Sequence, residues 1–273
     1  MNEREYNAAE GVRRSDLWKI NDSPEKFKYA IDNPDDSDPS PALVFGQAAH
    51  KMLLEPLDFS NEFAIRPEGI DRRTKEGKEE WNRFLGEAEG KTIITMDDYV
   101  TIRGMADKAM SVQKVEELLD GRKEVPFFWA DPDTGVKCKV KLDCLAYDGE
   151  TPVVVDYKTA KSARTEDFQR DCYKYGYHLQ AAMYTEAVMK CLGLAERPKF
   201  KFIVQEKDAP YSINVVSVTD DVMMYGLDTF RELIGIYHEC DEMGVWPGYM
   251  GAFGQENELG LPAWLAKDME SEN

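Results

Sequence analysis

The fold of this chain is decided by the stretch Thr151-Pro-Val-Val-Val-Asp-Tyr-Lys-Thr159, a short apolar run that ends in two opposite charges. Successive side chains of a strand point to opposite faces, so Val154, Asp156 and Lys158 are expected to share one face. The other face is expected to carry Val153, Val155 and Tyr157. Taken alone, the Asp-x-Lys pair also fits a solvated salt bridge on an edge strand, which contributes little to stability. The neighbouring strands decide between these interpretations.

A β-hairpin is expected directly before this strand. Residues 124–130 are aromatic and apolar, residues 131–135 form the turn, and residues 136–145 alternate. The alternation predicts one face with Lys137, Lys139, Lys141 and Asp143, and an opposite face with Val136, Cys138, Val140, Leu142 and Cys144. Asp143 and Asp156 should then lie on neighbouring strands, after a turn at residues 148–149. Two close carboxylates repel unless a cation lies between them, and a divalent metal is the usual answer. A solvated face explains the lysines equally well.

The remaining periodicities predict helices around this sheet. The expected helices span residues 15–20, 23–31, 42–54, 95–119, 165–192 and 220–243, and further strands span residues 199–207 and 211–218. In the helix over 165–192, one stripe carries Tyr173, Tyr177, Gln180 and Tyr184. A helix packed on the sheet gives the same pattern, so the tyrosines alone favour a core position. Gln180 is the exception, because a buried amide needs a partner.

Two features of the N-terminal half leave alternatives open. His50 lies on one stripe of the helix over 42–54, where a lone histidine is more simply a half-buried side chain bonded to a backbone carbonyl. Residues 66–78 carry five basic and three acidic side chains. This segment either closes over a phosphate backbone or is a solvated loop with a helix that begins at Thr74.

Composition and charge limit the classes of function. The 273 residues, 42% of them hydrophobic, suffice for one large or two small domains. The net charge of −18 requires any DNA-binding surface to be local. No apolar run approaches the ~18 residues of a membrane span, and the first residues lack a signal-peptide core, so a cytoplasmic location is expected. The five cysteines include no C-x-x-C pair, which indicates reduced thiols.

The ordered series of polar residues resembles the PD-(D/E)xK nuclease superfamily, in its RecB-like branch. The series is His50, Glu124, Asp143, Asp156-Tyr157-Lys158-Thr159, Gln180 and Tyr184. Three segments are similar to the RecE-type exonucleases of phages and prophages, the exodeoxyribonuclease VIII-like enzymes: Arg14-Ser-Asp-Leu17, Gly46-Gln-Ala-Ala-His50 and Tyr173–Gln180. Together these motifs span roughly residues 14 to 185.

The resemblance implies an α/β fold with a restriction-endonuclease-like core, a central mixed β-sheet flanked by helices, and a helical N-terminal part. We expect residues 1–120 to be mostly helical and to contribute His50, and residues 121–250 to form the nuclease core, in one globular domain. Residues 251–273 are expected to be an acidic flexible tail.

The resemblance also implies a function. Relatives of this type degrade linear double-stranded DNA from an end, 5′ to 3′, and pass the exposed strand to a RecT-like annealing partner in recombination. They form homo-oligomeric rings, and this chain would be a phage- or prophage-encoded protein. The cofactor would be Mg²⁺, with Mn²⁺ able to substitute.

The resemblance assigns roles to single residues. The implied metal ligands are His50, Glu124, Asp143, Asp156 and the backbone carbonyl of Tyr157. Lys158 would orient the attacking water or neutralise the phosphate, and Gln180 and Tyr184 would position the scissile phosphate or the metal waters. Asp143, Asp156 and Glu124 complete the catalytic set. The expected DNA contacts are Arg72, Arg73, Lys75, Lys78, Lys141, Lys161 and Arg164.

The sequence departs from the family pattern at the third acid, Asp156, where many relatives have Glu, and in its overall acidity. The positions of the cysteines disfavour the iron–sulphur branch. Two other functions fit the same residues: a RecB-like endonuclease of DNA repair, and a catalytically silent DNA-binding or assembly protein. The sequence leaves open the polarity, the processivity, the oligomeric state and the number of metal ions.

Overall fold

The computed structural model describes residues 3–34, 38–251 and 254–261. Most of the acidic tail expected over residues 251–273 therefore lies outside the described residues. In the described part, no helix has both the length and the apolar character needed to cross a membrane.

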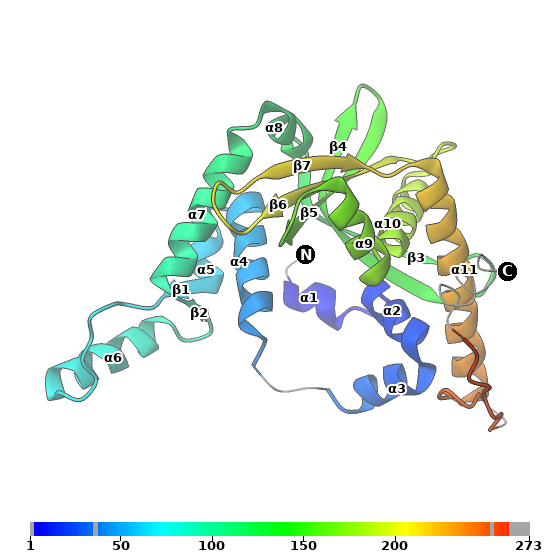
Figure 1. Ribbon diagram of the computed structural model, residues 1–273, viewed down its shortest axis with the longest axis horizontal. Helices are drawn as coiled ribbons and strands as arrows, with labels where there is room; N and C mark the ends of the chain where they lie inside the picture. The colour runs from blue at the N-terminus through cyan, green and yellow to red at the C-terminus, as the bar shows by residue number, and fades with distance from the viewer. Residues whose placement is uncertain (1–2, 35–37, 252–253, 262–273) are drawn as a thin grey trace, which may run out of the picture.

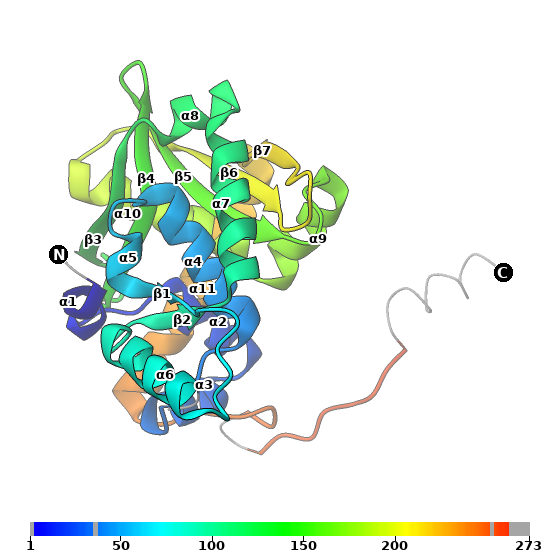
Figure 2. The ribbon, with the colours of Figure 1, turned by 90° about the vertical axis from the view of Figure 1, so that its left-hand side faces the viewer.

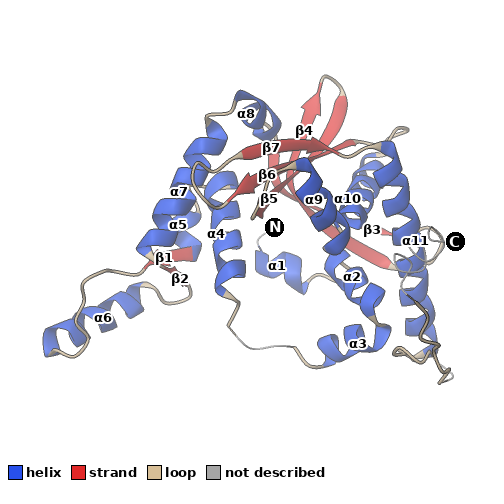
Figure 3. Cartoon of the chain, in the orientation of Figure 1, coloured by secondary structure: helices blue, strands red, loops and turns tan. Residues whose placement is uncertain are grey.

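A five-stranded mixed sheet lies at the centre of the molecule (Figures 1 and 3). Its strands, in spatial order, are β3 (Arg122–Ala130), β4 (Lys137–Asp148), β5 (Thr151–Ala160), β6 (Lys199–Glu206) and β7 (Ile213–Ser217). All neighbours are antiparallel except β5 and β6, which are parallel and are joined through α9 (Thr165–Lys174) and α10 (Tyr177–Leu192). A parallel pair needs such a crossover connection. The predicted α/β fold with a central mixed sheet is confirmed.

Helices cover both faces of this sheet. One apolar core joins the sheet to α10, α11 (Asp220–Met243), α2 (Arg14–Asp22) and α3 (Pro24–Asp32). The other joins it to α4 (Pro41–Leu54), α5 (Phe59–Glu62), α7 (Met96–Met110) and α8 (Gln113–Leu119), and in Figure 2 α4 and α7 lie in front of the strands. Val154 belongs to the first core, whereas Val153, Val155 and Tyr157 belong to the second. The predicted two-face pattern of β5 is therefore confirmed. The division at residue 120 stays a prediction.

Two predicted helices are each divided in two. The predicted helix over 95–119 begins with the expected cap, since Thr95 Oγ1 accepts a hydrogen bond from the Asp98 N–H at 3.0 Å, but it ends at Met110 before α8 begins. The predicted helix over 165–192 breaks at Gly176, which has φ +71° and lies against the Trp18 ring, where a Cβ atom would come within 2.5 Å. A left-handed glycine ends a helix. Tyr173 is therefore not on the stripe of α10.

The predicted alternation of β4 fails at Asp143. Leu142 packs in the core formed with α10, but Cys144 packs in the opposite core, against α8. At the same point of β3, Glu124 has φ +50°, and no Glu124–Asp143 pair lies between the pairs Lys123–Cys144 and Val125–Leu142, although the register is the same on both sides. The irregularity thus occurs at two of the predicted site residues.

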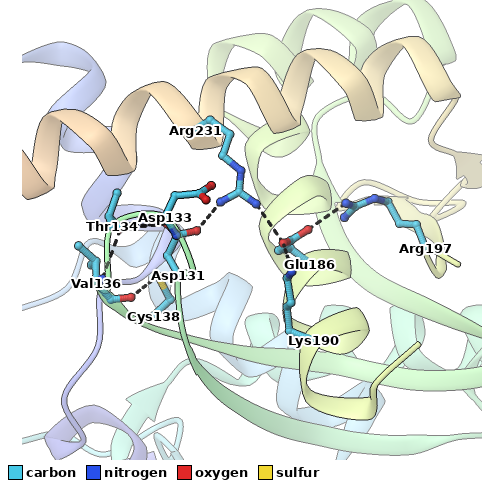
Figure 4. Close-up of polar contacts among 9 residues, drawn as sticks. All are labelled: Asp131, Asp133, Thr134, Val136, Cys138, Glu186, Lys190, Arg197 and Arg231. Atoms are coloured by element: carbon cyan, nitrogen blue, oxygen red, sulfur yellow. Dashed lines mark hydrogen bonds and ion pairs between the residues drawn. The ribbon is translucent and has the colours of Figure 1, made fainter. Parts of the chain in front are cut away.

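An ion-pair network connects the turn between β3 and β4 to α10 and α11 (Figure 4). Arg231 of α11 pairs with Asp131 after β3 and donates to Glu186 Oε1 of α10 at 3.0 Å. Arg197 donates to Glu186 Oε2 at 2.9 Å, and Thr134 donates to Asp131 Oδ1 through its N–H and its hydroxyl. Both carboxylates are buried, so this network satisfies charges that would otherwise be costly.

An arm extends away from the sheet on the side of α4 and α7 (Figure 1). It begins and ends at the parallel pair β1 (Phe63–Ile65) and β2 (Thr92–Ile94), and it carries α6 (Lys75–Glu87). Thr74 caps α6 by accepting a hydrogen bond from the Gly77 N–H at 3.0 Å. The helix predicted to begin at Thr74 is thus present, and apart from the Gly77 position every residue of α6 is at least partly exposed.

Candidate active site

Three of the predicted metal ligands converge from three different elements. His50 of α4 has its Nε2 atom 2.8 Å from Asp143 Oδ2 of β4 and its Nδ1 atom 3.6 Å from Glu124 Oε1 of β3. One potential ligand atom from each of these residues lies within 4.8 Å of the others. The strand irregularity at Glu124 and Asp143 and the packing of α4 on the sheet together create this cluster.

Asp156 and Lys158 lie side by side on β5, as their spacing predicts. Lys158 Nζ is 2.6 Å from Asp156 Oδ2, and Gln180 Nε2 of α10 donates a hydrogen bond to Asp156 Oδ1. Asp156 is only 1% exposed, so this pair is not the solvated salt bridge of an edge strand. The expected partner of the buried Gln180 amide is therefore Asp156.

The strand register brings the two aspartates together. Cys144 pairs with Val155, which places Asp143 and Asp156 opposite each other at the next position. The Tyr157 N–H donates to Asp143 Oδ2 at 2.7 Å. Asp156 adjoins the cluster of His50, Glu124 and Asp143 but is not one of the three residues whose ligand atoms lie within 4.8 Å.

Each acid of the site faces a basic side chain. His50 faces Asp143, Lys158 faces Asp156, and Lys141 Nζ lies 2.6 Å from Glu124 Oε2. Removing a carboxylate from water is costly unless a positive charge or a hydrogen bond compensates it. These basic groups supply that compensation.

The same contacts move the pKa values in opposite directions. Burial raises the pKa of Asp156 to about 6, although Lys158 opposes this change. Burial also raises the pKa of Glu124, against the effect of Lys141. For Asp143, burial is outweighed by His50 and Lys158, so its pKa lies below the ordinary value. Burial lowers the pKa of His50, but Asp143 and Glu124 outweigh it, and the pKa lies above the ordinary value.

The donor set fits a divalent cation. It combines carboxylate oxygens, which suit Mg²⁺, with an imidazole nitrogen, which suits Mn²⁺ and other transition metals. Gln180 Oε1 is buried and, within the described part of the chain, accepts no hydrogen bond. A buried acceptor of this kind needs a donor, which a water bound to the ion would supply.

A cleft of about 830 Å³ lies between α4, the sheet and the base of the arm. His50, Glu124 and Lys158 of the site line it, as do Phe63 of β1 and Thr92 of β2 at the arm, whereas Asp143 and Asp156 lie behind this lining. The cleft therefore connects the cluster of acids with the segment from which the arm extends.

Sequence reasoning assigned Tyr177 to the core, but it also belongs to this site. Lys158 Nζ lies 4.9 Å from the centre of the Tyr177 ring, and Tyr177 lines the cleft. This cation–π contact holds the lysine over the ring. The signal was present in the sequence, because Tyr177 is part of the Tyr173–Gln180 segment.

Tyr184 lies one turn beyond Gln180 on α10. Its ring packs near Phe200 in the core, and burial raises the pKa of its hydroxyl, with a smaller effect from Asp156 and Asp143. The Tyr184 hydroxyl is thus close enough to Asp156 and Asp143 for their charges to affect its pKa. Its role at the phosphate stays a prediction, as does that of the Tyr157 carbonyl.

The predicted DNA contacts lie in three places. Lys141 is inside the cleft, and Lys161 and Arg164 are exposed just beyond the end of β5. Arg72, Arg73, Lys75 and Lys78 are on the arm. The Arg72 guanidinium lies 4.8 Å from the centre of the Trp81 ring, Arg73 pairs with Asp71, and Lys75 lies 3.9 Å from Glu79.

The mixed sheet, the Asp-x-Lys strand and the convergent acids define a PD-(D/E)xK-type nuclease fold. Residues 14–255 match the model of the family described as a PDDEXK-like domain of unknown function (DUF3799), and the chain belongs to this family. The search of curated proteins finds no match.

One similar solved structure agrees on the fold. The crystal structure of a protein from Eubacterium rectale, described as a "putative exonuclease", is similar with a TM-score of 0.61 at 14% identity, over 98% of this chain and 97% of that chain. The structure of a protein named SSO0001 has a TM-score of 0.31 at 15% identity, over 70% of this chain and 84% of that chain, which is too distant to carry an argument.

Proposed function

We propose that this protein is a metal-dependent deoxyribonuclease of the RecE type, which degrades linear double-stranded DNA from an end. The observation that carries the proposal is the convergence of His50, Glu124 and Asp143 beside the Asp156–Lys158 pair, at a cleft that His50, Glu124 and Lys158 line. The similar fold of a protein described as a "putative exonuclease" also supports a nuclease function.

The chain supplies the ligands and fixes their orientation. His50, Glu124, Asp143 and Asp156 would hold Mg²⁺, or Mn²⁺ in its place. When bound, the ion lowers the pKa of a water and neutralises charge on the phosphate. Gln180 fixes Asp156 by donating to Oδ1, and the Tyr157 N–H fixes Asp143. Ligands held in this way lose little entropy when an ion binds.

Lys158 is the residue placed to act on the phosphate. Its ammonium group pairs with Asp156 and lies over the Tyr177 ring. Lys158 also lines the cleft. A cation held this firmly stabilises negative charge on the phosphate oxygens without reorganisation during the reaction.

The DNA path follows from the cleft. Phe63 and Thr92 connect the cleft to the arm, so a duplex bound at the acids passes the basic side chains of residues 72–78. Lys161 and Arg164 are exposed just after β5 ends, three and six residues beyond Lys158. Local basic groups of this kind are the phosphate contacts that a chain of net charge −18 requires.

The finer parts of the proposal extend the resemblance. They are the 5′ to 3′ direction, the release of a single strand to a RecT-like annealing protein, a homo-oligomeric ring, and a phage or prophage origin. Each is tested separately from the chemistry.

The experiment compares end-labelled linear duplex with closed circular DNA, in Mg²⁺, Mn²⁺ or EDTA. We expect degradation of the linear DNA in either metal, none in EDTA, and an intact circle. Asp143→Asn should abolish the reaction. Asp148→Asn changes an exposed acid of the same strand, paired with Lys199, and serves as the matched control that keeps full activity. Cleavage of the circle would contradict end dependence, and full activity of Asp143→Asn would contradict the proposed site.

A further inference from the structure

Tyr177 connects the catalytic cleft with a second aromatic residue outside it. Its ring is packed by Phe168 and Phe202, with ring centres 5.7 and 5.8 Å away, and Lys158 lies over it. These neighbours pack around the Tyr177 ring, which also lines the cleft. The adjacent Tyr175 ring, 5.8 Å away, is 43% exposed.

Tyr175 is exposed, yet its backbone is held in place. It ends α9, where its N–H donates to the Asp171 carbonyl at 2.9 Å, and the left-handed Gly176 follows. Arg14 of α2, which is 161 residues away in sequence, donates to the Tyr175 carbonyl at 2.9 Å. The exposed Tyr175 side chain therefore extends from a backbone held in place. Tyr175 is not part of the apolar core, so core packing does not explain why a tyrosine lies here.

Positive charge accompanies this ring. Lys174 Nζ lies 4.9 Å from the centre of the Tyr175 ring, and Lys174 is exposed. An exposed aromatic ring beside an exposed ammonium group has the chemistry that binds a nucleotide, because the base stacks on the ring and the phosphate pairs with the cation. The bases of an intact duplex are already stacked on one another, so the base that stacks here must be unpaired.

We propose that Tyr175 and Lys174 form a stacking subsite for an unpaired nucleotide of the DNA strand, adjoining the catalytic cleft through Tyr177. The subsite rests on the proposed nuclease function and deepens it. It would hold a nucleotide that has separated from its partner strand next to the reacting phosphate. Tyr175 is thereby a binding residue, and Tyr177 is a positioning residue for Lys158.

The test measures binding without catalysis. A single-stranded oligonucleotide containing 2-aminopurine is titrated with the full chain in EDTA, and fluorescence and anisotropy are recorded. Tyr175→Leu removes the ring and Tyr175→Phe keeps it. Tyr147→Leu changes another exposed tyrosine, near the C-terminal end of β4, and is the matched control. Hydrolysis of bis(p-nitrophenyl) phosphate, a diester without a base, reports on the catalytic groups alone.

We expect Tyr175→Leu to bind about five- to one-hundred-fold more weakly, the range for stacking of one base. Tyr175→Phe and Tyr147→Leu should stay within about twofold of the original protein, since neither loses the stacking ring. Lys174→Gln should reduce the salt dependence of binding by about one phosphate contact. The small diester should be hydrolysed at the same rate by all these variants.

Equal affinity of Tyr175→Leu and the original protein would overturn the subsite, and so would an equal loss in Tyr175→Phe, which would assign the effect to the hydroxyl. A loss of diester hydrolysis in Tyr175→Leu would also overturn it. Tyr175-dependent binding by a protein that cleaves no DNA would refute the nuclease proposal alone. A nuclease indifferent to Tyr175 would refute the subsite alone.

Discussion

Replacement of Arg231 by methionine tests how the fold supports the site from a distance. Arg231 joins Asp131 in the hairpin turn to Glu186 on α10, the helix that also carries Gln180 (Figure 4). The substitution removes two charge-assisted bonds and leaves two buried carboxylates less compensated. Each such bond contributes about 1.5–3 kcal/mol.

The expected loss is smaller than the sum of the two bonds. The Arg231 side chain is 36% exposed, so water screens part of the interaction, and Arg197 and Thr134 continue to serve the two acids. We therefore expect a loss of about 3 kcal/mol in the free energy of unfolding. For a chain of 273 residues this lowers the melting temperature by about 5 °C.

Thermal and urea unfolding in EDTA provide the measurement. Lys190→Met is the matched control, because Lys190 also approaches Glu186, at 3.8 Å, but is a more exposed partner. It should cost less than about 0.5 kcal/mol. A loss below about 1 kcal/mol in Arg231→Met, or an equal loss in both variants, would refute the reasoning about the buried network.

Three further predictions concern acid stability, catalysis and DNA binding. Burial lowers the pKa of His178, so the unfolded chain takes up a proton more readily than the folded chain, and stability falls as the pH drops through about 6.5. The melting temperature in EDTA should therefore fall less for His178→Phe than for the original protein between about pH 7.5 and 5.5. An equal fall in both proteins would contradict this. Lys158→Ala should lower the hydrolysis rate at least about a hundredfold but leave Mn²⁺ affinity by calorimetry nearly unchanged, and an equal loss of both would count against its role at the phosphate. Arg72→Ala and Lys78→Ala should each reduce the slope of log affinity for duplex against log salt by about 0.9, whereas Lys199→Ala should not, and unchanged slopes for the arm variants would remove the arm from the DNA path.

Local patterns were sufficient to predict the central sheet. The period of two in β5 depends on burial of both faces, and the structure places Val154 and Val155 in opposite cores as predicted. The helix break at Gly176 has a local signal, since glycine favours the positive φ that ends a helix, but the same residue is also tolerated inside helices, and the Trp18 ring that leaves no room for a Cβ atom lies on a distant helix. The positive φ of Glu124 could not be predicted either, because no local signal at a glutamate favours it.

The site could be predicted only in part. Asp156 and Lys158 were placed by strand geometry, and Gln180 was identified because a buried amide needs a partner, which is Asp156. His50 and Glu124 entered through the family resemblance, since nothing in their local sequence distinguishes a ligand from an ordinary surface or core residue. Tyr177 was missed as a site residue because an amphipathic helix explains a tyrosine on its buried stripe equally well.

The central claim is that the side chains of the proposed ligands, His50, Glu124, Asp143 and Asp156, surround one divalent cation. Anomalous diffraction from a crystal soaked in Mn²⁺ tests it most directly. We predict a peak about 2.0–2.4 Å from His50 Nε2 and from an oxygen of Asp143, after His50 gives up its proton. A map with no peak in the cleft, or with manganese bound only elsewhere, would contradict the claim.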